Sequence, residues 1–145
     1  MADILAAIEQ LAPVEALRAS FIAYPLVNAA HVGAVGVLLA SLLFLHSRAA
    51  GFFPAFSSRD AETTFRRVAL AAFGLAALTG IALFSINARE YAANPAFLVK
   101  LLLIVVAGLN FVLYFAVSFW RKGGAIASAI LWPAVLIAGR FIGFV

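Results

Sequence analysis

Long runs of apolar residues, separated by short polar segments, are the dominant pattern of this chain. Four such runs lie near residues 21–46, 67–86, 96–119 and 125–143. Each has about the 20 residues that an α-helix needs to cross the hydrocarbon core of a bilayer. The pattern therefore predicts four membrane-spanning helices in one all-α membrane domain, residues 1–145.

The segment before the first run has a mixed pattern. Within residues 3–20, apolar side chains recur at helical spacing from Ile4 to Leu11, whereas Glu9 and Glu15 face elsewhere. A helix with one apolar and one polar face lies in the plane of the membrane interface. We therefore expect an integral membrane four-helix bundle with a short N-terminal interfacial amphipathic helix.

The connections between the spans differ in length. Residues 47–66 form the longest, and its apolar stretch 51–56 is too short to span, so we expect it at the interface. Residues 87–95 read as a polar turn. Arg121–Gly124 reads as a tight basic turn between the third and fourth spans.

Composition agrees with a membrane protein. Hydrophobic residues make up 66% of the chain and charged residues 11%, against about 25% charged residues in soluble domains. The absence of cysteine excludes disulfides and thiolate ligands. The net charge of +4 does not point to nucleic acid, because the basic residues flank the apolar runs. We expect them to contact membrane lipid head groups.

The distribution of basic residues predicts an orientation. Six of the ten lie in the connections after the first and third spans, namely Arg48, Arg59, Arg66, Arg67, Arg121 and Lys122. Because cytoplasmic loops carry the excess of Lys and Arg, these connections are expected on the cytoplasmic side of a bacterial inner (cytoplasmic) membrane. Both termini of this multi-pass protein are then predicted to be periplasmic.

The candidate site is built on one of the two histidines. Asn28 and His31 are three residues apart and share a helix face. Lys100 begins the third span from the same side of the membrane, and Arg140 lies near the end of the fourth. We predict that these four side chains converge in the outer half of the membrane. There they would form a cofactor-binding site in which His31 is the metal ligand.

Three ligands suit such a site, and the cofactor is left open. Haem b would use His31 as its axial ligand, with Arg140 or Lys100 pairing the propionates. A quinone would accept a hydrogen bond from His31 or Asn28. An anionic lipid head group would pair with Arg140 and Lys100. The alternative without a ligand is an Asn28–His31 hydrogen bond between helices, with both cations snorkelling to the interface.

The second histidine does not complete the site. His46 is fifteen residues from His31, about 22 Å along a helix, so the two cannot bind one iron. We expect His46 to be a wetted interfacial residue. Thr79 and Asn110, near the centres of their spans, are expected to cross-link helices by hydrogen bonds.

The order of several motifs resembles the DUF6644-like family of small bacterial four-helix membrane proteins, an uncharacterised family. The residues that carry the resemblance are Tyr24–Asn28 with His31 and Gly33, Ala72–Gly74, Leu78–Gly80, Glu90–Phe97 with Lys100, Ala107–Asn110, Trp132 and Ala138–Phe144. The family is distantly similar to b-type cytochrome and CopD-like membrane folds. The chain departs from the family at Phe115, where members often carry a histidine.

These observations predict a non-enzymatic role, because no carboxylate lies within any span. The leading hypothesis is a small integral membrane subunit or anchor that packs against itself, as a homo-oligomer, or against a larger complex, including a respiratory one. The alternative is an electron-transfer protein that binds b-type haem or quinone through His31. A second alternative is a small oligomeric transporter or channel.

Overall fold

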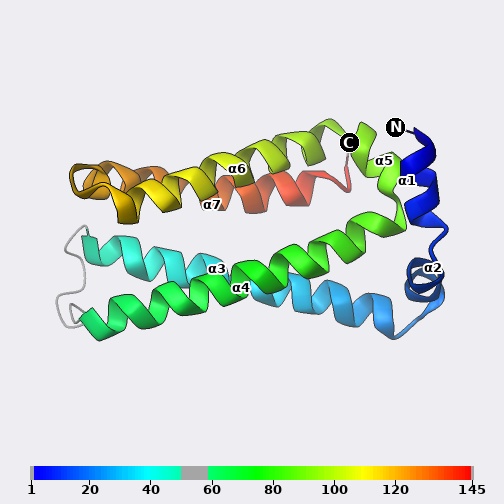
Figure 1. The fold of residues 1–145 in the computed structure, drawn as a ribbon, viewed down its shortest axis with the longest axis horizontal. Helices are drawn as coiled ribbons and strands as arrows, with labels where there is room; N and C mark the ends of the chain where they lie inside the picture. Colours follow the sequence, from blue (N-terminus) through cyan, green and yellow to red (C-terminus); the bar gives the residue numbers. More distant parts are fainter. Residues whose placement is uncertain (1, 50–58, 145) are drawn as a thin grey trace.

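The protein is an all-α bundle built on four long helices (Figure 1). The computed structural model describes residues 2–49 and 59–144, and these residues contain no β-strand. The long helices are α3 (Ala23–Ala49), α4 (Arg59–Ile86), α6 (Pro95–Ala116) and α7 (Arg121–Phe141). All four are long and apolar enough to cross a membrane, α7 together with the 3-10 turn before it. The predicted membrane bundle is confirmed at this level.

The bundle consists of two antiparallel helix pairs, α3/α4 and α6/α7 (Figure 1). Packing is closest within each pair, and α3 against α7 joins the pairs. In the described residues, α4 and α6 lack this close backbone packing. Both termini lie at one end, which we call the terminal end. The opposite end, where α6 connects to α7, is called the loop end.

Small side chains explain the close packing of α3 against α4. Ala69, Ala72 and Ala76 recur at spacings of three and four residues on α4, and all three are buried. Small residues at an interface allow helix backbones to approach closely in membranes. The core cluster adds the larger residues Leu38, Leu42, Leu45 and Trp132, and it lies toward the loop end.

The segment 3–20 forms two short helices instead of the single one expected. They are α1 (Ala2–Glu9) and α2 (Ala12–Ala19). Pro13 stands in the first turn of α2, where its missing N–H leaves no helical hydrogen bond unmade. The same proline is incompatible with one continuous helix, which explains the break.

Polar contacts fix these short helices across the terminal end. Glu9 accepts hydrogen bonds from the backbone N–H (2.9 Å) and Nε (3.0 Å) of Arg89, which belongs to α5 (Ala88–Ala93). The backbone N–H of Arg89, and then its guanidinium, hold the pKa of Glu9 below its ordinary value. Arg18 of α2 donates to the carbonyl of Ile86. Both N-terminal helices are therefore tied to the ends of spanning elements.

The helix start that the sequence predicts at residues 57–60, ahead of the apolar span near 67–86, agrees with the structure. Helix α4 begins at Arg59, well before residue 67. Asp60 and Glu62 lie in its first turn, where carboxylates favour a helix N-terminus. The apolar pattern therefore marked the span and not the full helix. The expectation for residues 51–56 lies outside the described residues.

The predicted turn at Arg121–Gly124 is wrong. The chain reverses through the 3-10 turn η2 (Ser118–Trp120), and Arg121 already begins α7. A β-carbon on Gly124 would lie 2.8 Å from Cδ1 of Trp120. Gly124 therefore permits the indole of Trp120 to pack closely against α7. In the sequence, a glycine with this packing role looks the same as a glycine in a turn.

Candidate functional site

A hydrogen bond between the two helices of the first pair orients His31. The Nδ1 atom of His31, on α3, lies 3.0 Å from Oγ1 of Thr79, on α4. The Thr79 hydroxyl is itself directed to carbonyls of its own helix, those of Leu75 (2.7 Å) and Ala76 (3.2 Å). A hydroxyl has one proton to donate. Because the contact with Leu75 is the shortest of the three, we assign the hydroxyl proton to it, and the proton of the His31–Thr79 bond to Nδ1.

This assignment fixes the chemistry of the other ring nitrogen. In a neutral imidazole with a proton on Nδ1, Nε2 holds an unshared electron pair. The hydrogen bond to Thr79 is made through Nδ1 and does not involve Nε2. A β-carbon on Gly80 would lie 3.1 Å from Cε1 of His31, so Gly80 makes room for the ring. His31 thus presents an oriented acceptor atom in the terminal half of the bundle.

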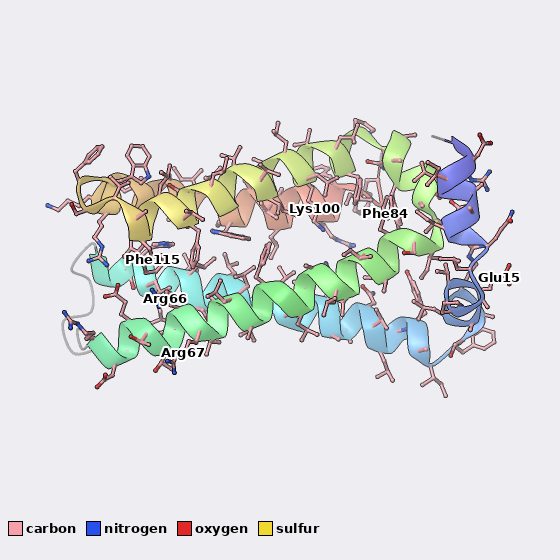
Figure 2. All side chains as sticks on the ribbon, viewed as in Figure 1. Glu15, Arg66, Arg67, Phe84, Lys100 and Phe115 are labelled. Atoms are coloured by element: carbon pink, nitrogen blue, oxygen red, sulfur yellow. The ribbon has the colours of Figure 1, made fainter. Side chains whose placement is uncertain are left out.

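The second helix pair places a cation beside this acceptor. Lys100 lies on the side of α6 that faces α3 and α4 (Figure 2), and it interacts electrostatically with His31. Its Nζ would lie 3.2 Å from a β-carbon on Gly139 of α7. In the described part of the chain, the ammonium makes no hydrogen bond or ion pair. A positive charge from the second pair therefore acts on the imidazole of the first pair.

The other two predicted site residues lie at the surface of the bundle. Asn28 is exposed on α3, and the hydrogen-bond partner of His31 is Thr79. Arg140 is exposed near the end of α7, with its guanidinium carbon 5.3 Å from the centre of the Phe144 ring. The structure therefore brings His31 and Lys100 together and directs Asn28 and Arg140 elsewhere.

Aromatic rings connect α4 to α6 beside this site. Phe84 and Phe97 stack with their centroids 5.3 Å apart, and Tyr91 of α5 lies 5.8 Å from Phe97. Figure 2 shows Phe84 in the same half of the bundle as Lys100. Burial raises the pKa of the Tyr91 phenol, which therefore stays protonated.

At the loop end, Arg66 lies 5.3 Å from the ring centre of Phe115 (Figure 2). Long side chains thus span the distance between α4 and α6.

The expectation that His46 is wetted is wrong. Its exposed fraction is 4%, and its ring meets Tyr114 of α6 edge to face at 5.1 Å. Both ring nitrogens are enclosed, and neither has a hydrogen-bond partner in the described ranges 2–49 and 59–144. The apolar pattern placed His46 at the end of a span, but α6 covers it from the neighbouring pair.

The predicted cross-links by Thr79 and Asn110 are confirmed. Asn110 of α6 donates from Nδ2 to the carbonyl of Gly124 on α7 (2.9 Å). It also accepts a bond at Oδ1 from Nε1 of Trp120 (3.1 Å). Asn110 therefore fixes the connection between α6 and α7, and Thr79 fixes α3 against α4.

The pairing of Thr79 with His31 was not predicted, although the positions of the two residues on their helices carry a signal for it. His31 lies eight residues after the start of α3 at Ala23, and Thr79 lies seven residues before the end of α4 at Ile86. Two antiparallel helices joined end to end place such residues at the same depth. The contribution of Gly139, which borders Lys100, left no comparable signal in the pattern.

Comparison with known proteins adds no relative. No protein-family model, no curated protein and no solved structure matches this chain.

Proposed function

We propose that this protein is a small, non-enzymatic integral membrane subunit that binds the head group of a hydroquinone at His31 and Lys100. The observation that carries the proposal is the bond from Nδ1 of His31 to Thr79, which leaves Nε2 as an acceptor. A fixed tautomer is how proteins prepare an imidazole for a specific partner.

The proposed ligand matches the two groups chemically. A hydroquinone hydroxyl donates to Nε2 of His31, and the ammonium of Lys100 donates to a hydroquinone oxygen. A quinone has only acceptor oxygens, and Nε2 cannot donate to them while the ring is neutral. We therefore expect the reduced form to bind more tightly than the oxidised form, whereas the sequence alone suggested that His31 donates to a quinone. A lipophilic tail suits a site within helices that can cross the membrane.

The proposed subunit role is supported by how little of the described chain lies outside the spanning helices. Apart from the spanning helices, the described chain forms only α1, α2, α5 and short connections. We propose that the bundle packs in the bilayer against a second copy or against a larger complex, including a respiratory one, that supplies or uses the ligand. Membership of the DUF6644-like family is likewise a proposal, which rests on residue resemblance alone.

Haem b is a second candidate, favoured by the same electron pair. An axial histidine binds iron through one nitrogen while the other donates a hydrogen bond, and Nδ1 of His31 already donates to Thr79. Lys100 would pair with a propionate. His46 is enclosed beside Tyr114 and is not available as a second ligand.

The test is a titration of the full chain, in lipid nanodiscs, with a short-chain hydroquinone and with the matching quinone. Empty nanodiscs correct for partitioning into lipid. We expect the variant His31→Ala to weaken hydroquinone binding by about tenfold, as for loss of one hydrogen bond whose partner is left unpaired. Asn28→Ala, an exposed polar residue of the same helix, is the matched control and leaves the affinity unchanged.

Two outcomes contradict the proposal. Equal affinity of wild type and His31→Ala would show that the head group binds elsewhere. A Soret band in protein from the native host, lost in His31→Ala but kept in Asn28→Ala, would favour haem over hydroquinone.

We also propose an orientation in which the terminal end faces the periplasm of a bacterium. The basic residues at the loop end support it, among them Arg66, Arg67 and Lys122. Because the chain has no cysteine, single cysteines report the topology directly. A membrane-impermeant maleimide applied to whole spheroplasts should label Phe144→Cys and not Lys122→Cys, and the reverse pattern would contradict this orientation.

A further inference from the structure

Four enclosed polar atoms without a hydrogen-bond partner among the described residues lie on three side chains toward the loop end. They are both ring nitrogens of His46, Oγ of Ser128 and Nε1 of Trp132. The exposed fractions of these residues are 4%, 1% and 7%. A buried polar group without a partner is unfavourable, and nearly all such groups in proteins are paired with protein or with ordered water.

The three residues border one part of the core. Trp132 belongs to the same buried cluster as Leu42 and Leu45 of α3. His46 follows Leu45 directly, and Ser128 precedes Trp132 by one turn of α7. Helices α3 and α7 pack against each other. Along its own helix, each of the three residues therefore lies within one turn of a member of this cluster or belongs to it, and the two helices pack against each other.

The chemistry of these atoms selects the ligand. Trp132 can only donate, Ser128 can donate and accept, and a neutral His46 does one at each nitrogen. The partner must therefore both donate and accept, and it must be small enough to be enclosed. A metal ion does not fit, because Trp132 supplies no electron pair. No group of three or more His, Cys, Asp or Glu side chains in the described ranges could hold a metal ion.

We propose that His46, Ser128 and Trp132 hold internal water between α3 and α7. This site is separate from the proposed site at His31, which needs neither water nor His46. In the proposed water site, the imidazole of His46 is hydrated and exchanges protons with water. It is then not an inert side chain of the core. Internal water thus provides hydrogen-bond partners of one chemical kind for all four unpaired atoms.

The test measures magnetisation transfer from water to protein by solid-state NMR on the full chain in bilayers. The chain has two tryptophans, so the indole N–H signals of Trp120 and Trp132 are separable. We expect rapid transfer from water to the His46 ring and to Nε1–H of Trp132, comparable with partly exposed Trp120. Transfer to the methyl groups of buried Leu42 and Leu45 should be slow. Transfer to His46 and Trp132 as slow as to those leucines would overturn the proposal.

The variant His46→Phe tests whether the residues share their water. Phenylalanine keeps a ring against Tyr114 and removes both nitrogens. Transfer to Nε1–H of Trp132 should fall several-fold in this variant, while transfer to Trp120 stays unchanged. Unchanged transfer to Trp132 would contradict a shared site. Should the variant fail to fold, the measurement on the wild type still decides the proposal.

Discussion

The two histidines of this protein lie on the same helix and differ in almost every other respect. His31 is partly buried, donates to Thr79 and faces the ammonium of Lys100. His46 is enclosed, packs on Tyr114 and has no partner at either nitrogen within the described part of the chain. The burial of an imidazole therefore does not by itself indicate a site for an organic ligand. What distinguishes His31 is a neighbour that fixes which nitrogen is available.

The two halves of the bundle also differ in how their helices pack. Long side chains bridge α4 and α6 at both ends, Phe84 with Phe97 near the terminal end and Arg66 with Phe115 at the loop end, but Lys100 lies in the terminal half (Figure 2). Toward the loop end, Trp132 and Leu42 pack into one core cluster, and Asn110 fixes the connection of α6 to α7. We therefore expect changes near the loop end to affect stability and changes near the terminal end to affect binding.

The largest expected effect is on the stability of the loop half. Gly124→Ala places a β-carbon 2.8 Å from Cδ1 of Trp120 and disturbs the bond from Trp120 to Asn110. Such overpacking destabilises a protein by about 1–3 kcal/mol. The measurement is the free energy of unfolding in mild detergent. Gly123→Ala is the matched control, because nothing lies within 4 Å of a β-carbon there. A large loss of hydroquinone affinity in Gly124→Ala would break the proposed separation of the halves.

A slightly smaller effect is expected from the partner of His31. Thr79→Val removes the acceptor for Nδ1–H, so the ring can change its tautomer and rotate. Loss of such an orienting partner weakens binding by about tenfold. Thr79→Ser keeps the hydroxyl and should bind nearly as the wild type does in the same titration. Equal weakening by valine and serine would mean that packing of the methyl group, and not the hydrogen bond, matters.

The space around the imidazole gives a finer comparison. In Gly80→Ala the new β-carbon would lie 3.1 Å from Cε1 of His31, so the ring must move by a few tenths of an ångström. We expect hydroquinone affinity to fall by roughly twofold to fivefold, because ligand geometry at a fixed site tolerates little displacement. Gly74→Ala, on the same helix with nothing within 4 Å, should have no effect. An effect of equal size at both positions would contradict a specific role for Gly80.

The smallest expected effect concerns the N-terminal helices and pH. Because the native pKa of Glu9 lies below its ordinary value of 4.5, its bonds to Arg89 stabilise the docked α1 above that pH. This contribution is lost as the pH falls through the native pKa. Spin labels at Ala7→Cys and Ala93→Cys should report a broader distance distribution between α1 and α5 in acid. The additional change Glu9→Gln should broaden it already at neutral pH. A distribution that stays narrow in the Glu9→Gln protein would show that apolar contacts alone dock α1.

The sequence predicted those features that depend on one helix at a time. Apolar length placed the four spans, and polar residues at their centres, Thr79 and Asn110, indicated cross-links. The sequence did not predict features that depend on which helix covers which. His46 is buried because α6 lies over it, and Gly124 is needed because Trp120 folds back onto it. The spacing of residues determines which face of its own helix a side chain lies on. Which neighbouring helix that face contacts is determined by tertiary packing.

The proposed binding site depends most directly on the protonation of His31, which ¹⁵N NMR of the imidazole in bilayers reports. At neutral pH we predict a protonated Nδ1 and an unprotonated Nε2 for His31, with the tautomer altered in Thr79→Val. A proton on Nε2, or a spectrum that is identical in wild type and Thr79→Val, would contradict the assignment of His31 as an oriented acceptor.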